Sequence, residues 1–379
     1  MTYYQFPNTT RRGVKMKQLL LLLTALVVSS AAMADTNISG YINVERFDIE
    51  GSEPFYDQHH MNIMLQHETD QFKFFTEIEF EHSAKFKAKE GADGDSEGST
   101  DGDAGAGSDA ESELDGGRGA VIVERAWIDW TLHKYVTLRS GLMLNNTLYL
   151  QNHYPSIINN ISRPQIVKKI FDAELEGFRL YGEAKGVIYE YWQGRGSQNP
   201  ADDTYNKGVS NGFALGYAGM AMNGDLDYSV KYLSGTYSVA DNSTTSTSTT
   251  DVADDTSTGI ELTLNWKNVG LWVEKGDRKS HKTSGATEAD RTGIYATLSY
   301  AIELDNGREI VPFYMHDSYK DDSKHDTDVV KSAYGFSYRP VPNFSFKMEY
   351  QATAAYDDNT GTEQDKSHQW ATGLVYFYN

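Results

Sequence analysis

Short stretches in which apolar and polar residues alternate constrain this chain more than any other feature. In the stretch 343–350, for example, Phe344, Phe346 and Met348 occupy every second position, and the residues between them are polar or charged. A period of two residues is typical of a β-strand with one apolar and one polar face, and helical spacing of apolar residues is not sustained anywhere. The sequence therefore predicts an all-β fold. We expect sixteen strands, near residues 37–47, 58–68, 71–82, 120–131, 134–144, 172–182, 186–193, 211–221, 225–237, 257–266, 269–276, 290–301, 308–318, 329–338, 343–356 and 366–379.

The connections between these expected strands alternate in length along the chain. Every second connection is a tight turn, such as Asn223-Gly224, and the others are long and polar, such as 238–256. A soluble sandwich has no reason to place every long loop on one side, whereas outer-membrane barrels combine short periplasmic turns, long extracellular loops and an even number of strands. Backbone groups in lipid need hydrogen-bond partners, so a spanning sheet must close on itself. The pattern predicts a transmembrane antiparallel β-barrel of about 16 strands.

The composition agrees with such a barrel and excludes several classes of protein. The 379 residues carry a formal net charge of −20, include no cysteine and have a mean hydropathy of −0.56. The lack of cysteine excludes a disulfide scaffold, a thiolate metal site and a Cys nucleophile. A pI near 4.9 argues against a nucleic-acid binder, whose footprint is basic. A membrane barrel can be this polar because one face of each strand is polar and points toward the lumen. We expect no cofactor.

The N-terminus has the features of a targeting segment. The basic residues Lys15 and Lys17 precede an apolar run and the small-residue cleavage signal Ala32-Met33-Ala34. These features predict an N-terminal extension and Sec signal peptide over residues 1–34, followed by the barrel over residues 35–379. Export without disulfides favours the outer membrane of a Gram-negative bacterium, where lipid and lipopolysaccharide would surround the barrel.

The connection 145–171 is the candidate for a constriction inside the barrel. It contains no Asp or Glu, although the chain has 54 acidic residues, and it carries Arg163, Lys168 and Lys169. A wide aqueous barrel is narrowed when a loop folds into it, and basic groups in a low-dielectric lumen attract anions. The alternative is an ordinary extracellular loop whose composition arose by chance.

Strand alternation also indicates which charged residues face the lumen. Arg139 and Arg179 alternate with apolar neighbours on the strands that flank the candidate constriction, so both should point inward. Glu77 and Glu79 should point inward from another strand. The lumen is therefore expected to be mixed in charge, which leaves a general or cation-preferring porin as the alternative to an anion-preferring one. The alternation around Arg125 is ambiguous, so its direction is left open.

The remaining polar features do not indicate a specific metal site or a catalytic site. The connection 83–119 is an acidic, Gly- and Ser-rich loop of low complexity, which favours a solvated segment and leaves weak binding of Ca²⁺ or Mg²⁺ open. The adjacent residues His59 and His60 would point to opposite faces of a strand. No spacing of Ser and His indicates a hydrolase. We therefore expect neither a specific metal site nor an enzyme.

One segment, 124–182, contains a set of recognisable motifs. The motifs are Glu124-Arg125-Ala126-Trp127-Ile128-Asp129-Trp130, Thr137-Leu138-Arg139-Ser140-Gly141, Ser162-Arg163-Pro164 and Glu176-Gly177 with Gly182. Its motifs are similar to those of the phosphate-selective porin O and P family, which also holds dicarboxylate-type trimeric porins. The resemblance implies a sixteen-stranded, homotrimeric, anion-preferring channel whose third loop narrows the pore, with Arg139 in the lumen and Arg163 as a loop anchor or constriction charge. Where that family has a charged residue and a Pro-Phe-Gly turn, this chain has Leu142 to Thr147.

The expected function is a passive outer-membrane diffusion channel for small hydrophilic solutes or ions, leaning to anions. A general or cation-preferring porin is the first alternative, and the reversal potential separates the two. A structural or adhesive barrel with a plugged lumen is the second alternative, and it predicts a conductance near zero.

Overall fold

The structure is a computed structural model. It describes residues 36–81, 121–152, 154, 158–171, 174–196, 209–240, 252–281, 289–321, 328–356 and 363–378. The expected signal segment 1–34 and the acidic connection 83–119 lie outside the described residues.

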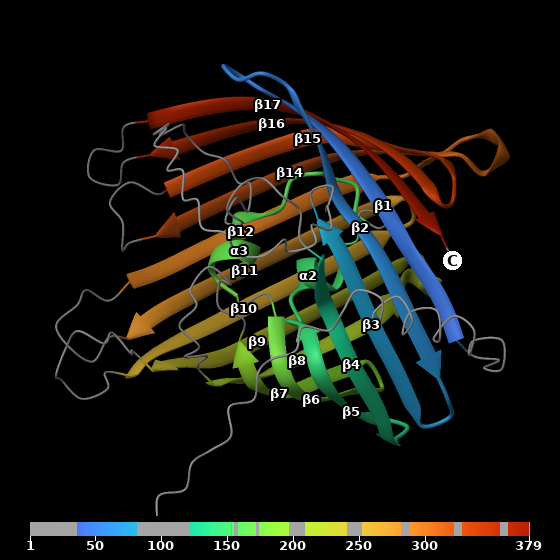
Figure 1. The fold of residues 1–379 in the computed structure, drawn as a ribbon, viewed down its shortest axis with the longest axis vertical. Helices are drawn as coiled ribbons and strands as arrows, with labels where there is room; N and C mark the ends of the chain where they lie inside the picture. The colour runs from blue at the N-terminus through green and yellow to red at the C-terminus, as the bar shows by residue number, and fades with distance from the viewer. Residues whose placement is uncertain are drawn as a thin grey trace, which may run out of the picture.

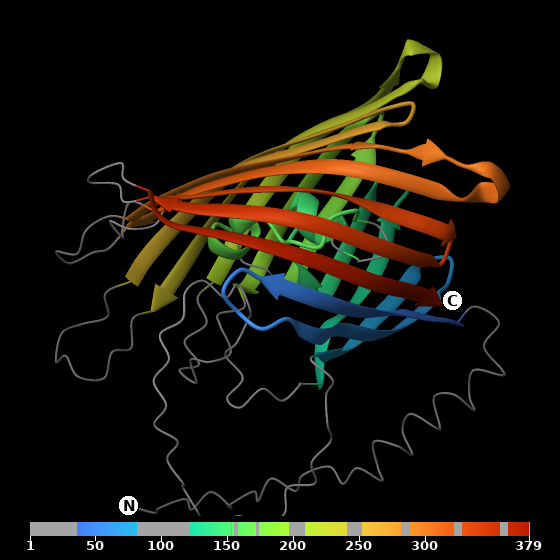
Figure 2. The same ribbon diagram turned by 90° about the horizontal axis from the view of Figure 1, so that it is seen from above.

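The described residues form a closed barrel of sixteen antiparallel strands, which confirms the predicted fold class (Figures 1 and 2). Each strand pairs with its neighbours in sequence, and β1 closes the barrel by pairing with both β2 and β17. The two-residue strand β13 continues β12 along the same partner, β14. The strands are β1 (Thr36–Ile49), β2 (Phe55–Glu68), β3 (Phe72–Glu81), β4 (Val121–His133), β5 (Val136–Leu144), β6 (Glu174–Ala184), β7 (Val187–Gly196), β8 (Val209–Ala221), β9 (Leu226–Ala240), β10 (Val252–Trp266), β11 (Val269–His281), β12 (Ala289–Tyr300), β13 (Ile302–Glu303), β14 (Glu309–Asp321), β15 (Asp328–Val341), β16 (Phe344–Tyr356) and β17 (Glu363–Tyr378).

Tight turns join the strands at one end of the barrel. Two of them contain short 3₁₀ turns, η2 (Met222–Gly224) and η3 (Asp305–Gly307). Asn223 and Asn306 adopt positive φ angles of 60° and 65° there, as the twist of a tight hairpin requires. Asn tolerates this left-handed conformation better than most residues, which explains why Asn223 and Asn306 mark the turns in the sequence.

The two faces of the barrel wall differ in polarity. On β14, the outward-facing Tyr314 is 47% exposed, whereas the inward-facing Met315 and Asp317 are fully buried. The same alternation leaves a belt of exposed apolar side chains around the outside and places polar and charged groups within. An apolar exterior with a polar interior is the arrangement of a barrel in lipid. Exposed aromatic residues at the tight-turn ends include Trp130, Tyr135, Trp266, Tyr300 and Tyr376.

The connection between β5 and β6 folds into the barrel. We call residues 145–171 the inner loop. It contains the short helices α2 (Leu148–Asn152) and α3 (Gln165–Lys169), and both views place these helices inside the ring of strands (Figures 1 and 2). Neither of these helices, nor any other helix in the described ranges, is long and apolar enough to cross a membrane.

Candidate functional site

The end of the inner loop packs against a row of glycines on the barrel wall. Gly259, Gly276 and Gly293 lie directly opposite one another on β10, β11 and β12. A Cβ atom at Gly276 would lie 2.9 Å from the ring of Phe171, and one at Gly293 would lie 3.3 Å from Ile170. Both loop side chains are almost fully buried. The missing side chains of the glycines therefore make the space that α3 and its end occupy.

Buried carboxylates of the wall hold the backbone of the inner loop. Glu274 on β11, Asp317 on β14 and Glu349 on β16 are each at most 1% exposed. Each accepts a hydrogen bond from a backbone N–H of the loop, and charge-assisted bonds of this kind are stronger than neutral ones. The bonds join Glu274 to Tyr149 N (3.4 Å), Asp317 to Gln165 N (2.8 Å) and Glu349 to Ile161 N (2.7 Å).

Buried lysines hold the carbonyl groups of the same loop. Lys231 on β9, Lys331 on β15 and Lys347 on β16 point inward, and each ammonium donates to a backbone carbonyl oxygen of the loop. The acceptors are Asn146 O at 2.6 Å, Arg163 O at 2.9 Å and Asn160 O at 3.4 Å, respectively. Acids thus bind the loop through its N–H groups, and lysines bind it through its C=O groups. The inner loop is therefore attached to wall strands between β9 and β16, and the buried wall charges there hydrogen-bond to its backbone.

The opposite wall carries ion pairs of its own. Arg139 on β5 makes two bonds to the carboxylate of Asp129 on β4, at 2.7 and 2.9 Å, and its guanidinium lies 3.6 Å from the ring centroid of Trp127. Arg179 on β6 pairs with Glu190 on β7 at 2.9 Å. Both arginines therefore face the interior, as the alternation predicts, and each has a carboxylate partner.

Arg125 also faces the interior. Its guanidinium lies 5.0 Å from the ring of Phe75 and 4.9 Å from the ring of Tyr154, and it pairs with Glu77. The pairing of β3 with β4 shifts register here, because Glu124 is an extra residue on β4. This β-bulge breaks the two-residue period, which is why the sequence alone could not orient Arg125.

The other predicted site residues occupy different places. Glu77 and Glu79 are buried on β3, where Glu77 pairs with Arg125 and Glu79 contacts His60. Arg163 lies on the inner loop, next to the segment held by Glu349 on the far wall. The backbone of Lys168 and Lys169 belongs to α3, but their side chains lie outside the described part. Glu77, Arg139 and Arg179 lie on β3, β5 and β6, and Arg163 on the inner loop interacts electrostatically with Glu124 on β4.

Burial raises the pKa of Tyr149 on the inner loop to about 12, so its phenol keeps its proton. Within the described ranges, no group of three or more His, Asp or Glu side chains is arranged to hold a metal ion.

No protein-family model and no curated protein sequence matches the chain.

Solved structures share the fold at low sequence identity. An anion-selective porin from Comamonas acidovorans matches with a TM-score of 0.61 and 8% identity over 90% of this chain and 99% of that chain. The trimer form of in-vitro folded OmpT, an outer membrane protein of Vibrio cholerae, matches with a TM-score of 0.56 and 10% identity over 90% and 99%. The outer membrane channel DcaP of Acinetobacter baumannii matches with a TM-score of 0.55 and 11% identity over 92% and 98%. At this identity the likeness shows the sixteen-stranded porin fold and nothing finer.

Proposed function

We propose that this protein is an outer-membrane porin, a passive diffusion channel for small hydrophilic solutes or ions that leans to anions. The observation that carries the proposal is a closed barrel with an apolar exterior and a charged interior, narrowed by the inner loop. The fold neighbours described as a porin and as an outer membrane channel support it. A position in the Gram-negative outer membrane, among lipid and lipopolysaccharide, belongs to the same proposal.

The path through the barrel is narrow under this proposal. Glu77, Glu274 and Lys331 face the interior of the barrel, yet they are between 0% and 2% exposed. Side chains that line a wide water-filled channel keep much of their surface in contact with solvent, so this burial favours a channel of small conductance. The inner loop also contacts the wall on the side of β4, where the ring of Tyr154 lies 4.9 Å from the guanidinium of Arg125.

The proposed preference for anions over cations rests on ion pairs of the inner wall. In the pair Arg125–Glu77 the cation is 11% exposed and the anion 0%, and in Arg139–Asp129 the values are 17% and 9%. The pair formed by Lys231 with its carboxylate partner on β10 follows the same order. A solute that reaches these pairs meets the more exposed cation first, and a positive charge that faces a low-dielectric lumen favours anions. Because the charges are paired, the preference should be mild.

The wider assignments are part of the proposal. The segment resemblance and the anion-selective fold neighbour support membership of the phosphate-selective porin O and P group. One fold neighbour is a trimer form, which supports a homotrimer. We propose transport without enzymatic activity, because the described inner charges that contact the loop serve to hold it. A plugged structural barrel is the second candidate, because burial as deep as this would also result if the inner loop closed the lumen completely.

Planar-bilayer recordings of the purified protein test the proposal. We expect small conductance steps and a reversal potential in a KCl gradient that indicates chloride preference. Arg139→Gln and Arg163→Gln should each reduce this preference, whereas Arg308→Gln, at an exposed tight turn, should leave it unchanged. Potassium preference would overturn the anion assignment. Silence at all voltages would overturn the channel and favour the plugged barrel.

A further inference from the structure

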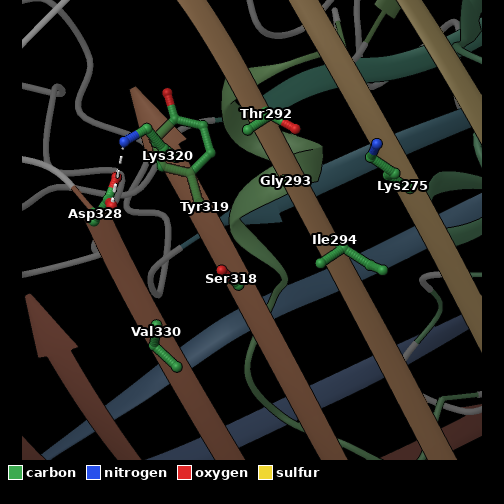
Figure 3. Close-up of a pocket in the computed structure, with 9 residues that line it drawn as sticks. All are labelled: Lys275, Thr292, Gly293, Ile294, Ser318, Tyr319, Lys320, Asp328 and Val330. Atoms are coloured by element: carbon green, nitrogen blue, oxygen red, sulfur yellow. Dashed lines mark ion pairs between the residues drawn. The ribbon is translucent and has the colours of Figure 1, made fainter. Parts of the chain in front are cut away.

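The outer wall of the barrel contains a hollow between β11 and β15 that is lined by both polar and apolar groups. It has a volume of about 250 Å³ and lies on the outside of the strands that carry the glycine row within. Figure 3 shows its side chains on these strands, with the inner loop visible behind them. The lining comprises Lys275, Thr292, Gly293, Ile294, Ser318, Tyr319, Lys320, Asp328 and Val330.

Strand register brings the polar groups of the hollow together. Thr292 on β12 lies opposite Lys320 on β14, and Ile294, two residues further on, lies opposite both Lys275 and Ser318. Residues two apart share a face of a strand, so these side chains all point away from the lumen. Two ammonium groups and two hydroxyl groups therefore line one shallow hollow on the outer surface.

The hollow lies where the apolar belt ends. Toward the tight turns, the same strands expose Leu298, Tyr314 and Tyr334. Toward the long connections, the outward positions are polar, as at Lys279 and Asp290. In a barrel whose long loops are extracellular, this boundary is the level of the headgroups of the outer leaflet, and lysines commonly reach such a level with the charge in water and the stem on apolar surface.

The charges at the hollow are loosely paired. Lys275 lies 3.7 Å from Asp277, and Lys320 lies 3.7 Å from Asp328, as the dashed line in Figure 3 marks. The lysine side chains are 54% and 44% exposed. Exposed pairs of this kind contribute little to stability, so a ligand that carries more negative charge than one carboxylate can compete for the ammonium groups.

The hydroxyl groups of the hollow are donors of the kind that phosphate oxygens accept. The hydroxyl of Thr292 donates to the carboxylate of Asp277 at 2.6 Å. A phosphate that takes Lys275 from Asp277 would compete for this hydroxyl as well. Ser318 lies beside it across β12 and β14 and adds a second hydroxyl to the same hollow.

We propose that this hollow binds the phosphorylated headgroup of an outer-leaflet lipid. The phosphate contacts Lys275, Lys320 and the hydroxyl groups, and the acyl chains lie along Ile294, Val330 and the apolar belt below them. Continuity with that belt selects a lipid over free phosphate, because only an amphiphile uses both surfaces. The inference rests on the proposed outer-membrane location but not on the conduction of ions.

Lipid binding by the purified full-length protein tests this site. The probe is a diphosphorylated lipid A, measured by native mass spectrometry of the protein in non-ionic detergent, with the dephosphorylated form of the same lipid for comparison. We expect the double variant Lys275→Gln/Lys320→Gln to bind lipid A roughly thirtyfold more weakly, from the attraction of two lysines to an anionic surface. The control is Lys267→Gln, which removes an exposed lysine that lies 3.8 Å from Asp225 at the tight-turn end.

Each outcome bears on the proposal. Wild-type affinity in the double variant, equal binding of the dephosphorylated lipid, or an equal loss in Lys267→Gln would overturn it. Displacement of lipid A by inorganic phosphate alone would show that the hollow binds free anions. This result would also overturn the proposal. The double variant should keep the heat-stable gel mobility and conductance of the wild type. A silent channel with intact lipid binding overturns the proposed function alone.

Discussion

Replacing Gly276 with alanine tests whether the inner loop is held against the barrel wall. The added Cβ would lie 2.9 Å from the ring of Phe171 and 3.0 Å from Cγ2 of Ile170, which is closer than side-chain carbons approach one another without strain. Both loop side chains are almost completely buried. The methyl group introduced at this position therefore has to push the end of α3 away from β11.

The expected size of the effect follows from overpacking. Extra carbon atoms in a well-packed interior cost about 1–3 kcal/mol. The same energy shifts the equilibrium between an attached and a detached loop about 5- to 150-fold. Gly373→Ala is the matched control, because its Cβ would lie 3.6 Å from Glu45 and 3.7 Å from Ile161 of the inner loop, at ordinary contact distance.

Single-channel recordings measure this equilibrium as the fraction of time spent in a high-conductance state. We expect the ratio of time in the high-conductance state to time in the low-conductance state to rise by the factor above in Gly276→Ala and to stay at the wild-type value in Gly373→Ala. Heat-stable mobility of both variants on gels verifies that the barrel is folded. Equal behaviour of the two variants, with both folded, would refute the attachment of α3 to the glycine row.

Three further substitutions address other contacts. Glu349→Gln replaces the charged acceptor of Ile161 N at 2.7 Å and should weaken loop attachment by about 1 kcal/mol, seen as more frequent high-conductance events; an unchanged record would mean that this bond does not hold the loop. Asp129→Asn removes the countercharge of Arg139 and should increase chloride preference in the reversal potential, and a shift toward potassium would contradict the proposed role of Arg139. Trp192→Ala removes a 5% exposed ring that lies on glycines of β8 and β9, and should lower the free energy of unfolding by about 3–5 kcal/mol in denaturant titrations; a loss below about 1 kcal/mol would show that the ring does not pack there.

The strands could be predicted because their physics is local. A half-buried strand in a barrel repeats every two residues, so the run from Phe344 to Met348 marks β16 without knowledge of its neighbours. Asn223 and Asn306 mark tight turns because the turn needs their positive φ. The alternation of short and long connections then fixes closure, since only a membrane barrel separates the two kinds of connection in this way.

The site was predicted only in part, because its geometry depends on distant contacts. Strand alternation correctly pointed Arg139 and Arg179 inward, but the bulge at Glu124 hid the direction of Arg125. The sequence marked the inner loop by its lack of acids, yet nothing local indicates its path. That path depends on wall residues such as Lys331, which lies 168 positions along the chain from the carbonyl it binds.

The most direct test of the account is the single-channel conductance of the wild type beside a variant in which residues 148–169 are replaced by a short Gly-Ser linker. We expect small, discrete conductance steps for the wild type and steps several times larger for the variant, because the inner loop lies inside the barrel and is bonded to its wall. Equal conductance in the two proteins would contradict the claim that this loop narrows the channel. Silence of both folded proteins would contradict the claim that the barrel is a channel at all.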